Sequence, residues 1–331
     1  MRTRVILHLL FAALALSASG GAAWSQDIQP VTVAVSSRSV PGTIAQIALE
    51  MGLYKKHGID AKVVNMDNSS VATAALLSGS VQYMTSSSNE VVMAQAQGRD
   101  IVALNSLYSG FSGVVVLAKP VADKLGVLPS GPVQNRFKAL DGLVIAAPSA
   151  SSSFTAALRP AAESAGAKIR FTYMAQSTMV PALQNGAIQG FIASAPFYAL
   201  SVQNNTGVIW INGPKGEFPT QYTPASATGL NTLRSFADQH PQLTNKMKDV
   251  FVDFSETVKN NPQSVKAAIA RLFPMDPKTL DLVFESESVS FKTRSLSASD
   301  MAREISFVKA SGAQVPGLNS VDPAKLLYTT K

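Results

Sequence analysis

Short apolar runs and amphipathic stretches alternate along the chain from Pro30 onward. Residues 31–35 have the pattern of a buried strand, and residues 43–56 place apolar side chains at helical spacing before Gly58. Strand-like and helix-like segments continue in the same order through residue 104. Such alternation predicts an α/β architecture in which the strands are mostly parallel.

The same order of elements recurs in the second half of the chain. Strand-like residues 143–147 end in a serine-rich turn, as residues 31–35 do. Residues 182–189 repeat residues 75–82, with Ala, Leu, Gly and Gln identical at matching positions. In both copies a helix, a glycine and a strand follow one another. We therefore predict two similar lobes.

Two lobes built in this order need two connections. We expect the chain to cross near residues 112–118 and to return near residues 213–226, before a mostly helical C-terminal part. The predicted division is a first lobe formed by residues 26–115 and 225–331 and a second lobe formed by residues 116–224. A ligand cleft lies naturally between such lobes, and hinge closure is the natural motion.

Residues 1–25 have the pattern of a secretory signal peptide. Arg2 and Arg4 precede an apolar run over residues 5–16, and small residues follow it up to an expected cleavage after Ser25, with cleavage after Ala23 as an alternative. The apolar run is too short to span a bilayer. We therefore expect a cleaved leader and export of the mature protein.

Composition excludes several classes of function. The 331-residue chain is 46% hydrophobic and 15% charged, which rules out intrinsic disorder. It contains no cysteine, so disulfides, thiolate metal sites and cysteine nucleophiles are impossible. Its three histidines are too scattered for the usual metal centres. The formal net charge is +7, but no basic run with interleaved aromatic residues occurs. We expect no cofactor and no nucleic-acid partner.

Hydroxyl-rich turns follow several of the predicted strands. In open α/β sheets, ligands bind beyond the carboxyl ends of the strands, where free backbone N–H groups and helix dipoles favour anions. One serine per helix would be an ordinary N-cap, but runs of three or four exceed that need. The candidate ligand-binding residues are Ser36, Ser37, Arg38, Ser86, Ser87, Ser88, Ser149, Ser152, Ser153 and Pro196.

Arg38 is the most informative charge among these candidates. Its guanidinium could grip a carboxylate, a sulfonate or a phosphate at the expected cleft. A solvated loop arginine explains the same position equally well. The expected ligand is a small anion such as a sulfonate, nitrate or an aromatic carboxylate. A neutral heterocycle stays open as an alternative, because hydroxyls and backbone amides serve either kind of ligand.

No catalytic motif accompanies the serines. The sequence around Ser112 is GFSGV, which lacks the final glycine of a G-x-S-x-G elbow. No phosphate-binding loop, dinucleotide fingerprint or H-E-x-x-H motif occurs. We therefore expect a binding protein and no enzyme. A serine-dependent periplasmic hydrolase or transferase is one alternative, and a sensor that presents bound solute to a receptor is another.

Four segments together resemble the periplasmic solute-binding proteins of nitrate-, sulfonate- and taurine-type ABC importers, the NMT1-like group. They are residues 47–60 (IALEMGLYKKHGID), 75–82 (ALLSGSVQ), 140–147 (LDGLVIAA) and 185–196 (NGAIQGFIASAP). The chain departs from this pattern at Gln82 and Gln189, where the family usually has Asp. These two positions have a structural role in our interpretation.

The resemblance implies a type II periplasmic-binding-protein fold. In that fold each lobe is a mostly parallel sheet flanked by helices, and two crossing strands join the lobes. It further implies a periplasmic monomer that closes on a small molecule and delivers it to a membrane permease and its ATPase. Ligand contacts would fall on residues 36–38, 86–88 and 149–153. The implied activity is capture without chemistry.

Overall fold

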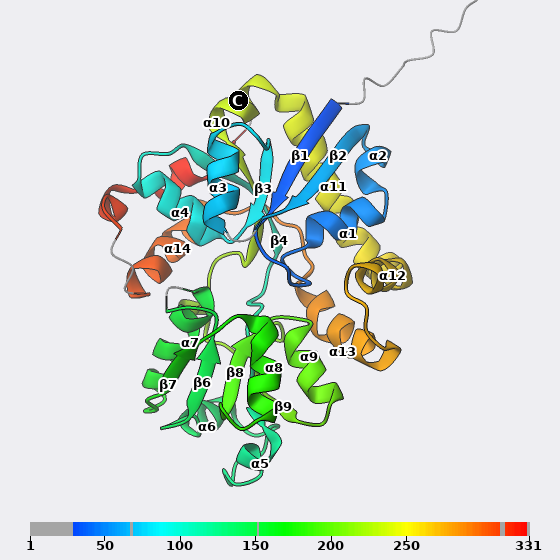
Figure 1. The fold of residues 1–331 in the computed structure, drawn as a ribbon. Coiled ribbons are helices and arrows are strands. Elements are labelled where there is room, and N and C mark those ends of the chain that lie inside the picture. The colour runs from blue at the N-terminus through cyan, green and yellow to red at the C-terminus, as the bar shows by residue number, and fades with distance from the viewer. Residues whose placement is uncertain (1–28, 67–68, 151, 312–314, 330–331) are drawn as a thin grey trace, which may run out of the picture.

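The computed structural model describes residues 29–66, 69–150, 152–311 and 315–329, so the predicted signal peptide lies outside the described part. Two five-stranded sheets lie one above the other (Figure 1). The first sheet has the order β2-β1-β3-β10-β4. Its strands are β1 (Gln29–Val35), β2 (Ile59–Asn65), β3 (Tyr83–Ser86), β4 (Ile101–Tyr108) and β10 (Thr228–Leu233).

The second sheet repeats the topology of the first with the order β7-β6-β8-β5-β9. Its strands are β5 (Val114–Ala118), β6 (Val144–Ala147), β7 (Arg170–Tyr173), β8 (Gly190–Ala193) and β9 (Gly207–Asn212). In each sheet the first three strands are parallel and the fourth is antiparallel to its neighbours. That fourth strand is the one that arrives from the other sheet. The predicted two-lobed α/β fold is confirmed.

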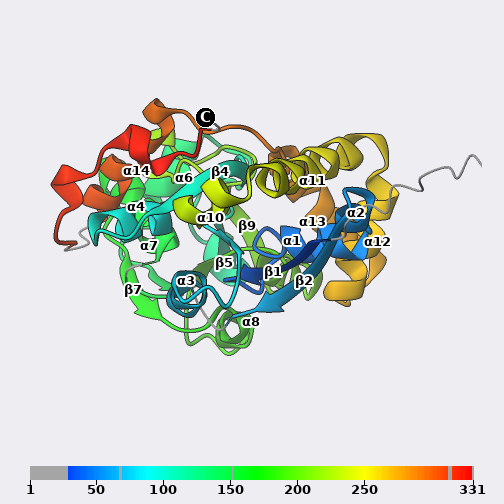
Figure 2. The same cartoon turned by 90° about the horizontal axis from the view of Figure 1, so that it is seen from above.

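Helices cover both faces of the first sheet (Figure 2), with α4 and α14 on one side and α1, α2, α11 and α12 on the other. Those around the first sheet are α1 (Ile44–Glu50), α2 (Leu53–Lys56), α3 (Ser69–Leu77), α4 (Ser88–Ala96), α10 (Arg234–Gln239), α11 (Pro241–Asn260), α12 (Pro262–Leu272) and α14 (Ala298–Ala310). Those around the second sheet are α5 (Lys119–Ala122), α6 (Val133–Lys138), α7 (Ser153–Ser164), α8 (Gln176–Gln184) and α9 (Phe197–Gln203), with α13 (Pro277–Glu287) against α9. Single 3-10 turns occur at Thr220–Tyr222, Ser288–Ser290, Leu318–Ser320 and Pro323–Leu326.

Among the helices of the described residues, none has the length and hydrophobicity needed to cross a bilayer.

One predicted helix is divided in the structure. The sequence favours a single helix over residues 43–56, whereas the chain forms α1 and then α2. Gly52 separates them with φ = 72°, a left-handed conformation that glycine adopts without steric cost. The prediction was wrong here because apolar spacing continues through a backbone break.

Gln82 and Gln189 occupy equivalent places in the two sheets. The Gln82 side-chain oxygen accepts a hydrogen bond from Thr32 N at 2.9 Å, and that of Gln189 accepts one from Val144 N at 2.9 Å. The backbone N–H of each glutamine donates back to the same residue at 3.0 Å. Each glutamine therefore ties the start of β3 or β8 to the neighbouring strand, which supports the structural role expected from the repeat.

The chain passes between the sheets through residues 109–113 and again through residues 213–227. The two connections touch, since Gly213 N donates to Gly113 O at 3.0 Å. A side chain at residue 213 would collide with this carbonyl, so only glycine fits. The lobe limits expected from the sequence fall inside β5 and in the loop before β10.

Two buried glutamates hold these connections. Glu287, on α13, accepts hydrogen bonds from the hydroxyls of Tyr108 at 2.5 Å and Tyr198 at 2.9 Å. Glu304, on α14, accepts one from Ala225 N at 2.5 Å. Burial raises the pKa of both carboxyls to about 7, although these donors act in the opposite direction.

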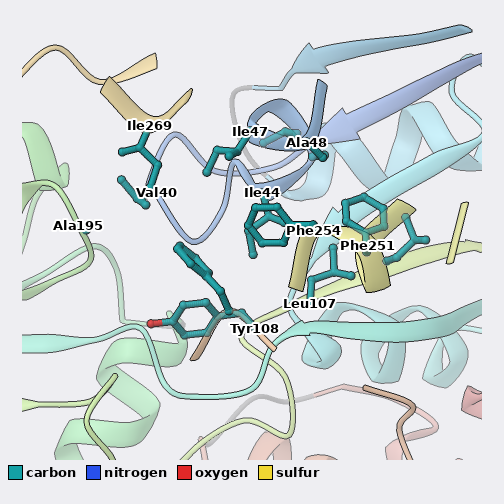
Figure 3. Close-up of a cluster of buried hydrophobic side chains, with 14 of the residues drawn as sticks. Val40, Ile44, Ile47, Ala48, Leu107, Tyr108, Ala195, Phe251, Phe254 and Ile269 are labelled. Carbon is teal, nitrogen blue, oxygen red and sulfur yellow. The ribbon is translucent and has the colours of Figure 1, made fainter. Parts of the chain in front are cut away.

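Apolar packing is continuous from one lobe to the other (Figure 3). Val40 and Ile44 of the first lobe, Ile269 of α12 and Ala195 of the second lobe belong to the same cluster of buried side chains. At this contact Val40 N donates to Ala195 O at 2.9 Å. The lobes therefore meet through both hydrophobic packing and a direct backbone hydrogen bond.

Stability should fall as pH rises through the range set by Glu287 and Glu304. Their pKa values are near 4.5 in an unfolded chain and about 7 in the folded protein. Between these values the folded protein binds more protons, so the free energy of unfolding decreases with rising pH. We expect denaturant titrations to show a loss of roughly 2 to 5 kcal/mol between pH 5 and pH 8.

The double variant Glu287→Gln, Glu304→Gln should flatten this decline because it removes both ionisations. Glu285→Gln is the matched control, since Glu285 lies on the same helix with 76% of its side chain exposed. A double variant that keeps the wild-type slope would show that other groups cause it.

Candidate ligand-binding site

A cavity of about 390 Å³ lies where the carboxyl ends of the strands of both sheets meet. Ser36 and Ser86 reach it from β1 and β3 of the first sheet. Ser149 and Ser194 reach it from the ends of β6 and β8 of the second sheet. Its volume is in the usual range for small-molecule sites, and its position at strand ends is where α/β proteins bind ligands.

Seven of the ten residues predicted from the sequence line this cavity. They are Ser36, Ser37, Ser86, Ser87, Ser149, Ser152 and Ser153. The structure therefore brings together three serine turns that are up to about a hundred residues apart in the chain. Equivalent strand ends of two similar lobes face each other, which is why a repeated pattern in the sequence becomes a single lining.

The serines at the helix starts differ in what they do. Ser152 caps α7, because its hydroxyl accepts a hydrogen bond from Thr155 N at 3.2 Å. Ser87 occupies the N-cap position of α4, but it makes no side-chain cap and its hydroxyl donates to Ser226 O at 3.2 Å instead. Ser87 thereby ties the cavity wall to the returning connection between the lobes.

Arg38 does not line the cavity, contrary to the sequence-based expectation. Its side chain is exposed, while the next residue, Ser39, is buried and lines the cavity. The turn fixes this orientation: Ser39 Oγ accepts from Gly42 N at 3.3 Å, and Ser39 O accepts from the Thr43 hydroxyl at 3.0 Å. Because the chain turns Ser39 inward, Arg38 points to solvent.

Ser88 and Pro196 also lie outside the cavity. The Ser88 hydroxyl is buried 2.6 Å from a Glu304 carboxylate oxygen and accepts from Ser226 N at 3.0 Å, so it is engaged in the interior. Pro196 is buried and follows Ala195, whose carbonyl holds the first lobe through Val40. Both residues belong to the framework around the cavity.

Sequence reasoning missed several lining residues. Thr85, Asn89, Glu90, Gln176 and Ser194 all contribute to the cavity. Thr85 Oγ1 and Asn89 Oδ1 are buried without a hydrogen-bond partner. The hydroxyl-rich run around residues 85–89 could have indicated that Thr85 and Asn89 line the cavity. Glu90 and Gln176 carried none, since first-turn polar residues of helices usually face solvent.

The lining suits hydrogen bonding. Gln176 already accepts from Ser194 N at 2.8 Å, which leaves its amide nitrogen as its remaining polar atom. Glu90 is the sole ionisable side chain among the lining residues within the described ranges. Burial raises the pKa of Glu90, and a hydrogen bond from Ser69 acts against this shift. No histidine lies beside the described serines of the lining to act as a base.

A family model, the NMT1-like family, matches residues 24–273, which is well over half of the chain. The chain belongs to the NMT1-like family. The family resemblance inferred from the sequence is thereby confirmed. This member is also similar to a Brucella abortus protein named only as a candidate binding protein, with 24% identity over 287 residues, 85% of this chain and 82% of that one.

Solved structures of other proteins share the fold of this NMT1-like chain. The periplasmic aliphatic sulphonate-binding protein SsuA of Escherichia coli matches with a TM-score of 0.68 and 14% identity, over 90% of this chain and 98% of the other. The periplasmic nitrate-binding protein NrtA of Synechocystis matches with a TM-score of 0.57 and 13% identity, over 89% of this chain and 86% of the other. At these identities the likeness establishes the type II binding-protein fold.

Replacing Thr85 by Val should not destabilise the protein. Thr85 Oγ1 is buried without a partner, so a methyl group of the same shape removes an unmet polar group. We expect the free energy of unfolding, measured by denaturant titration after refolding, to change by less than about 0.5 kcal/mol or to rise.

Thr232→Val on the neighbouring strand β10 is the matched comparison. The Thr232 hydroxyl is fully buried and donates to Gln82 O at 2.7 Å, so its loss should cost about 1 kcal/mol or more. Equal losses in both variants would contradict the view that Thr85 is left free for a ligand.

Proposed function

We propose that this chain is the extracytoplasmic solute-binding component of an ABC importer. It takes a small polar solute into the cavity between its lobes and delivers the solute to a membrane permease and its ATPase. One observation carries the proposal: the cavity is built from equivalent strand ends of both lobes. A ligand that touches both walls stabilises the closed arrangement, because it makes its full set of contacts only there.

The comparisons support this role. The NMT1-like family includes the chain, and the structures that share its fold carry names that describe periplasmic sulfonate- and nitrate-binding proteins. A periplasmic location agrees with the signal-peptide pattern of residues 1–25. Residues Ser36, Ser37, Ser86, Ser87, Ser149, Ser152 and Ser153 are the proposed ligand contacts.

The proposed motion is a rotation of the lobes about residues 109–113 and 213–227. The two connections touch each other, and buried glutamates hold Tyr108, next to the first, and Ala225, within the second. A pivot of this kind lets the cavity open while the lobes remain attached. The Val40–Ala195 hydrogen bond joins the two lobes and would break if they separate at this contact.

Bulky residues on either wall should abolish solute binding. Ser37→Leu fills the cavity from the first lobe and Ser153→Leu fills it from the second, so each should prevent closure on a solute. We expect a small-molecule extract of the producing cells to raise the melting temperature of the wild type, since occupancy at 100 times Kd adds about 2.7 kcal/mol. Both variants should lose this shift.

Ser306→Leu is the matched control, because Ser306 is an exposed serine on α14 and does not line the cavity. Variants are compared only if their melting temperatures without extract stay near that of the wild type. A full shift in either cavity variant would place binding elsewhere. Uptake of the bound solute by intact cells then tests import: unchanged uptake in a strain without the protein would favour a sensor.

A further inference from the structure

The charge of the cavity wall restricts what the cavity can hold. Among its lining residues that the structure describes, Glu90 carries the sole ionisable side chain, and no lysine, arginine or histidine accompanies it. The described ion pairs of the molecule do not include Glu90 either. An anion in this cavity would therefore face a carboxylate without a compensating cation.

Helix capping does not explain the position of the Glu90 carboxylate. Ser87 and Glu90 have the S-x-x-E spacing of a capping box, in which the two side chains bond to the backbone of the first helical turn. In the structure no such side-chain cap forms on α4. The Ser87 hydroxyl donates to Ser226 O, and the Glu90 carboxylate accepts from Ser69. The carboxylate is thus free of the helix backbone and remains part of the cavity wall.

Two more acceptors lie beside Glu90 on the same wall. Thr85 is 1% exposed and its hydroxyl has no partner, and Asn89 Oδ1 is likewise buried and unpaired. Both residues line the cavity: Thr85 lies in β3, and Asn89 lies in the first turn of α4, which follows after Ser87. A buried polar atom without a partner costs free energy, so a ligand that supplies donors to it gains affinity.

The helix N-termini around the cavity favour negative charge, whereas Glu90 disfavours it. The N-termini of α4 and α7 are at this site, and their dipoles favour negative charge. A molecule with an acidic group and a basic nitrogen satisfies the helix N-termini and the Glu90 carboxylate together, and an uncharged molecule with N–H groups is compatible with both. A molecule of net negative charge leaves Glu90 facing like charge.

We infer that the solute has zero or positive net charge and directs N–H donors at the wall formed by Thr85, Asn89 and Glu90. Suitable classes are amines, amidines, amides and zwitterions. This inference rests on the proposed function and refines its ligand. It differs from the anion expected from the sequence. Arg38 was one reason for that expectation, together with the helix N-termini, and the structure places Arg38 at the surface.

Charge fractionation of the extract tests the inference. The small-molecule extract of the producing cells is passed over a strong anion exchanger at pH 7, and the retained and unretained pools are each added to the protein. We expect the unretained pool, which holds neutral, zwitterionic and cationic molecules, to raise the melting temperature. A shift produced by the retained pool alone would overturn the inference and leave the solute-binding function intact. No shift with either pool would overturn the proposed function itself.

Glu90→Gln tests the contact. Its amide keeps the shape and an acceptor but loses the charge, so we expect at least about a tenfold rise in Kd for the active pool, measured by dilution series. Glu256→Gln, at an exposed glutamate of α11 outside the cavity, should leave Kd unchanged. Equal Kd values for wild type and Glu90→Gln would show that Glu90 makes no ligand contact.

Discussion

One buried carboxylate, that of Glu287, joins the two lobes. It accepts hydrogen bonds from Tyr108, at the end of the last strand before the chain leaves the first sheet, and from Tyr198 of α9 beside the second sheet. The turn just after it adds Ser290, whose carbonyl accepts from Ser109 N at 2.8 Å and whose hydroxyl donates to Pro214 O at 3.2 Å. Both connections between the lobes are therefore attached to the same short segment. The lobe rotation proposed above would occur about this point.

This anchoring has consequences for the cavity. Glu304 fixes the returning connection at Ala225 and lies beside Ser88, the first residue of α4. The wall that contains Asn89 and Glu90 thus starts from a residue held in the interior. Hydrogen bonds of Glu304 and Ser88 therefore connect the returning connection to this wall, and the cavity serine Ser87 adds a further one to Ser226 O.

Much of the fold could be predicted from the sequence because its signals are local. Strand patterns, glycine helix ends and the repeat of residues 75–82 at 182–189 specify elements whose pairing follows from their order. The helix break at Gly52 was not predicted, because the apolar spacing continues across the break in the backbone. The serine turns were found because equivalent strand ends meet. Arg38 was expected at the cavity and Glu90 was not among the candidates. The direction of a side chain on a turn depends on contacts such as that of Ser39 with Gly42, which the sequence does not show. The partners of Glu287 lie 89 and 179 residues away, a separation that no local pattern records.

The hydrogen bond between the lobes at Val40 and Ala195 is made by backbone atoms. Side-chain replacements at these two residues therefore leave its donor and its acceptor in place, apart from a proline at residue 40. This hydrogen bond and the side chains that line the cavity are therefore specified by different atoms. Under the proposed function, descendants of this sequence can exchange cavity-lining residues and still keep the backbone hydrogen bond between the lobes.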